Sequence, residues 1–149
     1  MGIYRSILAV VDLSANGGRV IDRAQALASA FPGATLKLLH IVEYVPVEPL
    51  SDSLLPAVQI EGELVERART QLAQVAARLA PVPDWEVAVG NVKSEIVRVA
   101  RGGGHDVIVI GNHERHGLSI LVNLTEDAVL HAAPCDVLAV HLGRAERGT

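Results

Sequence analysis

The sequence predicts an α/β fold, in which one open parallel β-sheet carries helices on both faces. Five short apolar runs, each of strand length, alternate with segments of helical periodicity. Strands that alternate with helices form a parallel sheet, because right-handed crossover connections place the helices on its faces. The chain has 149 residues, 50% hydrophobic and only 3% aromatic, which suits a single domain, 1–149, with an aliphatic core.

In chain order, the first predicted strand is Ile7–Val11 and precedes a helix with one apolar face. That face carries Val20, Ala24, Leu27 and Phe31. Asn16 is the expected N-cap of this helix, since its side-chain oxygen can accept a hydrogen bond from a first-turn amide. The second strand, Thr35–Val42, leads into the irregular linker Glu43–Ser53. Loops after parallel strands lie at the carboxyl end of the sheet, where such folds bind ligands.

The second predicted helix, about Val58–Leu79, has apolar residues on one face and charged residues on the other. The apolar residues are Leu64, Ala68, Leu72, Val75 and Leu79, and the charged residues expected to face solvent are Glu61, Glu63, Glu66, Arg67 and Arg69. The third strand is Trp85–Val89, followed by a helix over Val92–Arg101. Gly102-Gly103-Gly104 precedes a strand and is therefore expected to cap that helix.

The last three predicted elements are a strand over Val107–Gly111, a helix over about Leu121–Ala132 and a strand over Val137–Leu142. The last helix is expected to stop before Pro134, because the residue that precedes a proline disfavours helical geometry.

The composition excludes several classes of protein. Thirteen basic against seventeen acidic residues give a net charge of −4, which provides no cationic surface for nucleic acid. No apolar run approaches the ~20 residues of a membrane-spanning helix, and no signal-like cleavage site is present, so we expect a cytoplasmic protein without membrane contact. Cys135 is the single cysteine, which excludes an intrachain disulfide and a cysteine metal cluster.

The motifs of two common parallel-sheet functions are missing. A phospho-receiver needs clustered carboxylates after the first strand and a lysine after the last, but Asp12 stands alone and neither Lys37 nor Lys93 is in place. A dinucleotide-binding fold needs G-x-G-x-x-G directly after the first strand, where this chain has Asp12-Leu13-Ser14-Ala15-Asn16-Gly17-Gly18. His113 and His116 are close in sequence with only Glu114 beside them, so no metal site is predicted, and spacing identifies no catalytic residue.

Four segments, in this order and spacing, resemble the universal stress protein family. They are Ile7–Ser14, Leu38–Val42, Asp106–His113 and Ala133–Val140. The resemblance covers nearly the whole chain. It implies a Rossmann-like sheet with strand order 3-2-1-4-5 in a small cytoplasmic stress-response protein, usually dimeric.

Family members that bind ATP carry G-x2-G-x9-G, followed by Ser or Thr, after the fourth strand. On this sequence the motif begins at Gly111, has Glu114 and Leu124 where two glycines are needed, and ends at Thr125. A carboxylate beside the phosphates repels them, since two unit charges ~4 Å apart interact by ~4 kcal/mol at an effective dielectric of 20. The chain therefore resembles the branch without nucleotide, and no cofactor is expected. ATP or AMP binding is the alternative.

The resemblance identifies six positions of this degenerate nucleotide site: Asp12, Ile41, Gly111, Asn112, His113 and Thr125. Asp12 matches the acidic residue near adenine and ribose, and Ile41 the position whose backbone contacts adenine. Without a ligand, Asp12 would cap the turn before the first helix and Ile41 would be core. Ser14 and Thr125 match positions where relatives carry hydroxyls, and because some members are phosphorylated on Ser or Thr, both are candidate phosphorylation sites. The alternative is that each hydroxyl only forms a hydrogen bond to a neighbouring carbonyl.

In the order 3-2-1-4-5 the last strand is an edge, and Val137, Leu138, Ala139 and Val140 carry no charge. Uncharged edges tend to pair with another strand. We expect two copies to join antiparallel through these strands about a two-fold axis, as is usual in the family. The alternative is that residues 143–149 fold back over the edge.

The expected function is regulatory or binding, without enzymatic turnover, and is carried out through protein partners that the sequence does not identify. The alternative function is a nucleotide-responsive switch with at most slow hydrolysis.

Overall fold

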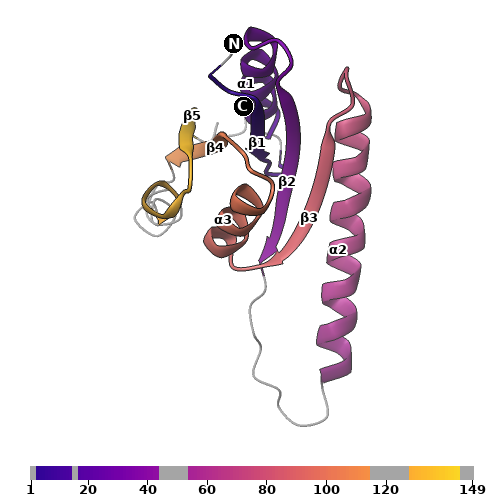
Figure 1. The fold of residues 1–149 in the computed structure, drawn as a ribbon. Coiled ribbons are helices and arrows are strands. Elements are labelled where there is room, and N and C mark those ends of the chain that lie inside the picture. The colour runs from indigo at the N-terminus through magenta and orange to yellow at the C-terminus, as the bar shows by residue number, and fades with distance from the viewer. Residues whose placement is uncertain (1–2, 15–16, 44–53, 115–127, 145–149) are drawn as a thin grey trace.

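The computed structural model describes residues 3–14, 17–43, 54–114 and 128–144. These residues contain a five-stranded sheet in the order β3-β2-β1-β4-β5, with all neighbours parallel (Figure 1). The strands are β1 Ser6–Val10, β2 Thr35–Glu43, β3 Asp84–Gly90, β4 Val107–Glu114 and β5 Asp136–Arg144. The predicted fold class and strand order are confirmed.

Helices cover both faces of the sheet. They are α1 Gly17–Ala30, α2 Leu54–Ala77 and α3 Val92–Gly102, and residues 128–132 are also helical. The predicted cap Asn16, most of the linker after β2 and the first part of the predicted fourth helix lie outside the described residues. Glu43, placed in that linker by the sequence prediction, is the last residue of β2.

The core consists of two aliphatic layers, because side chains alternate between the faces of each strand. In β1, Ile7 and Ala9 pack with α1 and α2, whereas Leu8 packs with α3 and with Val129. The aromatic rings of Tyr4 and Trp85 are only partly buried and contact the first layer from its margin. The predicted aliphatic core is therefore confirmed for the described residues.

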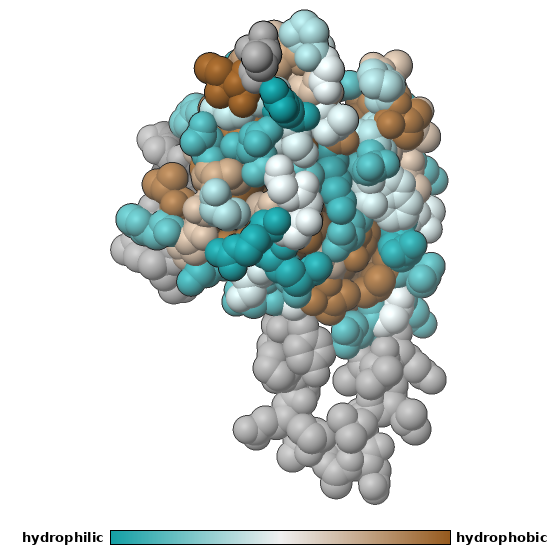
Figure 2. All heavy atoms as spheres, in the orientation of Figure 1, coloured by the Kyte–Doolittle hydropathy of each residue, from teal (hydrophilic) through white to brown (hydrophobic). Residues whose placement is uncertain are grey.

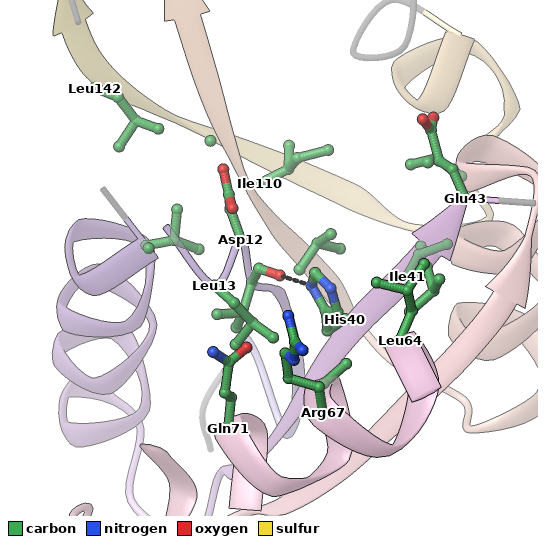
Figure 3. Close-up of a pocket in the computed structure, with 18 residues that line it drawn as sticks. Asp12, Leu13, His40, Ile41, Glu43, Leu64, Arg67, Gln71, Ile110 and Leu142 are labelled. Atoms are coloured by element: carbon green, nitrogen blue, oxygen red, sulfur yellow. Dashed lines mark hydrogen bonds between the residues drawn. The ribbon is translucent and has the colours of Figure 1, made fainter. Parts of the chain in front are cut away.

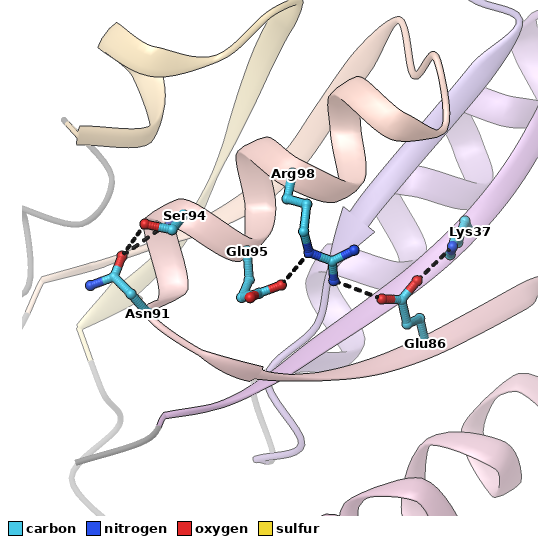
Figure 4. A network of polar contacts seen from close by, with 6 residues as sticks. All are labelled: Lys37, Glu86, Asn91, Ser94, Glu95 and Arg98. Atoms are coloured by element: carbon cyan, nitrogen blue, oxygen red, sulfur yellow. Dashed lines mark hydrogen bonds and ion pairs between the residues drawn. The ribbon is translucent and has the colours of Figure 1, made fainter. Parts of the chain in front are cut away.

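α3 has a defined cap at each end. The side-chain oxygen of Asn91 accepts the backbone amide of Ser94 at 3.0 Å (Figure 4). At the other end, Gly104 has a φ of 62°, and the amide of His105 donates to the carbonyl of Ala100 at 3.0 Å. This is a Schellman motif, which needs a left-handed residue and favours glycine. The predicted capping role of the triple glycine is confirmed.

The surface seen in Figure 2 is mainly hydrophilic, and hydrophobic side chains gather beside α2 toward the lower end of the sheet, where the strands end (Figures 1 and 2). No described helix combines the length and the apolar character that crossing a bilayer requires. Cys135 is half-buried against the second core layer, where burial raises the pKa of its thiol.

Candidate functional site

A cavity of about 570 Å³ opens at the carboxyl ends of β1, β2 and β4 (Figure 3). Its volume lies within the range of small-molecule sites. Much of its lining is aliphatic. These side chains lie on or next to β1, β2, β4 and β5: Val10, Val11, Ile41, Val42, Ile110 and Leu142. α1, which follows β1, packs on one face of the sheet, whereas Val129, in the described helical residues between β4 and β5, packs on the other. Such switch points are where open α/β sheets bind ligands.

Asp12 follows β1 and lies at the turn that leads into α1. Its Oδ1 accepts the backbone amide of Ser14 at 2.9 Å, and its side chain lines the cavity. Gly17, the first residue of α1, packs so closely that a Cβ there would overlap the carbonyl oxygen of Asp12. Asp12 therefore supports the turn, as the ligand-free interpretation predicts, and also lies at the position that the family resemblance implies for a ligand contact.

His40 enters the cavity from β2. Its Nδ1 lies 2.8 Å from the carbonyl oxygen of Val11. Because a carbonyl only accepts, Nδ1 carries the proton and Nε2 is the nitrogen that remains for another contact. His40 is not among the site residues predicted from the sequence. Its signal was a polar residue within the apolar run Leu38–Val42, near the carboxyl end of the strand.

α2 provides the other polar side chains of the cavity, Arg67 and Gln71. The sequence predicts Arg67 on the solvent-facing side of this helix. The residue is exposed, but Figure 3 shows its guanidinium beside His40, on the wall of the cavity. Its exposure agrees with the prediction, and it also borders the cavity because it lies one helical turn from Leu64 and from Gln71, which line the cavity too.

The structure brings three of the six resemblance-derived residues together, since Asp12, Ile41 and Gly111 all line the cavity. Ile41 also packs against the second core layer. A Cβ on Gly111 would lie 2.6 Å from Cδ1 of Leu142 and 3.2 Å from Cγ2 of Val20. The φ of Gly111 is not among the positive ones, so the close approach of β5 and α1, rather than a left-handed turn, explains this glycine.

The other residues predicted for the site or for phosphorylation are not among the described residues that line this cavity, apart from those named above. Asn112 and His113 continue β4, and Thr125 lies outside the described residues. Ser14 is exposed at the β1–α1 turn. Within the described ranges, no three His, Cys, Asp or Glu side chains gather as metal ligands would.

A serine and a histidine do meet at the opposite, amino end of the sheet. Oγ of Ser6 lies 2.8 Å from Nδ1 of His105. The adjacent carboxylate of Asp106 accepts the backbone amides of Arg5 and Ser6, at 2.7 and 3.0 Å, and Nε2 of His105 is buried without a partner in the described structure. Burial lowers the pKa of His105. This arrangement anchors the strand start and lacks the linear order of a catalytic triad.

Comparison with known proteins agrees with the fold. The profile described as the universal stress protein family matches residues 3–141. Universal stress protein A homolog 2 of Coxiella burnetii (strain RSA 493 / Nine Mile phase I) is 35% identical over 144 residues, which cover 95% of this chain and 98% of the relative.

Two solved structures are also similar. Universal stress protein UspA from Lactobacillus plantarum has a TM-score of 0.71 and 25% identity, covering 94% of this chain and 99% of that one. A universal stress protein in complex with cAMP has a TM-score of 0.60 and 25% identity, covering 94% and 98% of the two chains.

Proposed function

The chain belongs to the universal stress protein family, and from this premise we propose that it is a homodimeric stress-response binding protein that does not use ATP as a bound cofactor. The proposal includes a regulatory role without enzymatic turnover, a cytoplasmic location, and action through ligands or protein partners at the carboxyl end of the sheet. The cavity at that end supports a binding role, since its described lining offers polar contacts but no nucleophile–base pair.

The observation that carries the proposal is the replacement of two motif glycines by Glu114 and Leu124. The path of the backbone at residue 114 supports it. β4 continues as a strand through Glu114, which pairs with Arg144 of β5 after a register shift. A phosphate-binding loop needs backbone amides that are free to bind the phosphate, and a backbone paired in a strand ladder does not offer such a loop. The negative charge at 114 adds repulsion, which at ~4 kcal/mol lowers affinity by nearly three decades.

A nucleotide-responsive switch is the second candidate. It is favoured by the retention of Asp12, Ile41 and Gly111 at the cavity, and by a solved family member described in complex with cAMP. In this version the chain binds AMP or ATP weakly and hydrolyses the nucleotide slowly at most.

Titration calorimetry with Mg-ATP, and separately with AMP, at high protein concentration tests the proposal. We expect no measurable ATP heat. A dissociation constant of tens of micromolar or tighter overturns the proposal and supports the switch. The double variant Glu114→Gly/Leu124→Gly tests the cause, because it restores the glycines and removes the charge. It should gain ATP affinity, whereas Glu63→Gln, which removes one exposed carboxylate from α2 outside the cavity lining, should not.

A further inference from the structure

Three polar side chains of the cavity, those of His40, Arg67 and Gln71, gather on one wall. Arg67 and Gln71 lie one turn apart on α2 and both line the cavity. Figure 3 shows their side chains on the same side as the imidazole of His40. The hydrogen bond from Nδ1 of His40 to the carbonyl of Val11 fixes the ring, with Nε2 left for a ligand. This wall therefore combines a guanidinium, a carboxamide and one imidazole nitrogen.

Arg67 has no counter-ion among the described residues. The ion pairs found there join Lys37 to Glu86, and Arg98 to Glu86 and Glu95, across β2, β3 and α3 (Figure 4). A guanidinium presents its N–H donors in a planar fork that matches carboxylate and phosphate groups, so an unpaired one beside an apolar cavity is well suited to an anion.

The carboxylates of the cavity are separated from this wall. Asp12 accepts the amide of Ser14, and in Figure 3 its carboxylate is directed away from Arg67. Glu43, the last residue of β2, also lines the cavity and lies apart from Arg67 in Figure 3. The cavity is therefore positive at the Arg67 wall, apolar in its middle and negative elsewhere, which orients a ligand that has one anionic end.

We propose that the cavity binds a small organic anion, an apolar or aromatic body with one carboxylate or phosphate group, and that Arg67 and Gln71 hold the anionic group. The inference rests on the proposed function in that it takes the same cavity as the binding site. It differs in placing anion recognition on α2 instead of on the loop after β4. It therefore depends neither on the glycine motif nor on the exclusion of ATP.

Fluorescence titration with anilinonaphthalene sulfonate, an aromatic anion, tests the inference on the full chain. We expect saturable binding that AMP or octanoate displaces, the two competitors distinguishing a nucleotide source of the anion from a fatty-acid source. Arg67→Gln should weaken probe binding about tenfold or more, since a charge-assisted hydrogen bond is lost. Arg67→Lys should retain part of the affinity. Arg101→Gln, the same change on an exposed residue in the last turn of α3 that does not line the cavity, should have no effect.

Circular dichroism and thermal melting separate loss of folding from loss of binding. Equal probe affinity in the parent and in folded Arg67→Gln overturns the inference, and so does the absence of saturable binding to the parent. Arg67-dependent binding that either competitor displaces supports it. The two proposals can fail separately. If the chain binds ATP tightly and Arg67→Gln leaves that binding unchanged, the proposed function is contradicted. If Arg67→Gln leaves probe binding unchanged, only this inference is contradicted.

Discussion

At the scale of single residues, Gly17 and Gly18 differ sharply although they are adjacent. A Cβ at Gly17 overlaps the carbonyl oxygen of Asp12, whereas a Cβ at Gly18 meets nothing within 4 Å. We predict that Gly17→Ala lowers the free energy of unfolding by about 1–3 kcal/mol, as overpacking does. Gly18→Ala, the matched control, should raise it by about 0.4–1 kcal/mol. Urea unfolding measures both, and equal effects would contradict the prediction.

His105 predicts a pH dependence of stability. Burial lowers its pKa from 6.5 in the folded chain, with Lys37 adding to the shift and Asp106 opposing it. The unfolded chain therefore takes up the proton first as the pH falls. The stability due to neutral His105 is complete above the unfolded pKa and is lost as the pH falls from that value through the folded pKa.

His105→Asn should therefore flatten the decline in unfolding free energy on the acid side of pH 6.5. Urea unfolding of the parent and the variant at a series of pH values provides the measurement. His131→Asn, at an exposed position, is the control and should keep the parent slope. A variant profile parallel to that of the parent would show that His105 does not cause the dependence.

The residues of the cavity that could be predicted from the sequence are those on strands or at strand ends. Asp12, Ile41 and Gly111 lie on strands or at strand ends, where an element's place in the chain also fixes its place at the carboxyl edge. Arg67 and Gln71 were missed because hydrophobic periodicity identifies the apolar face of a helix but not which polar side chains at the border of that face line a cavity. Tertiary packing decides which of them do.

At the scale of elements, the start of α3 depends on one cap. Oδ1 of Asn91 accepts hydrogen bonds from the amide and the hydroxyl of Ser94, at 3.0 and 3.2 Å. Asn91→Ala should lower the free energy of unfolding by about 1 kcal/mol, because a first-turn amide loses its partner. Asn91→Asp keeps an acceptor and should be nearly neutral. Thermal unfolding followed by circular dichroism compares the two, and similar losses would contradict a capping role.

Element types followed from the sequence, but element ends did not. The apolar run predicts the end of β4 at Gly111, whereas the strand continues to Glu114 because its ladder with β5 extends to Arg144. α2 begins at Leu54 instead of Val58 and includes Pro56 in its first turn, where a proline removes no helical hydrogen bond. Backbone pairing with a distant strand, unlike periodicity, leaves no local signal.

At the scale of the whole molecule, the two sheet edges differ in charge. The β3 edge carries Glu86, which pairs with Lys37 at 2.9 Å and with Arg98 at 3.1 Å. The hydrogen bond from Lys37 lowers the pKa of Glu86, so this edge keeps its charge. The β5 edge has no charge from Val137 to Val140. Charged edges resist pairing with other chains, which favours β5 as the proposed dimer contact.

The structure also determines which substitution tests this contact. Val140 is 5% exposed in the first core layer, so a charge there would unfold the chain, whereas Leu138 is 38% exposed. Leu138→Lys should yield folded monomers in light scattering, because two-fold symmetry brings both lysines into one interface. Val82→Lys, at an exposed residue away from β5, should remain dimeric. A monomeric parent, or a dimer unaffected by Leu138→Lys, would exclude β5 pairing as the means of assembly.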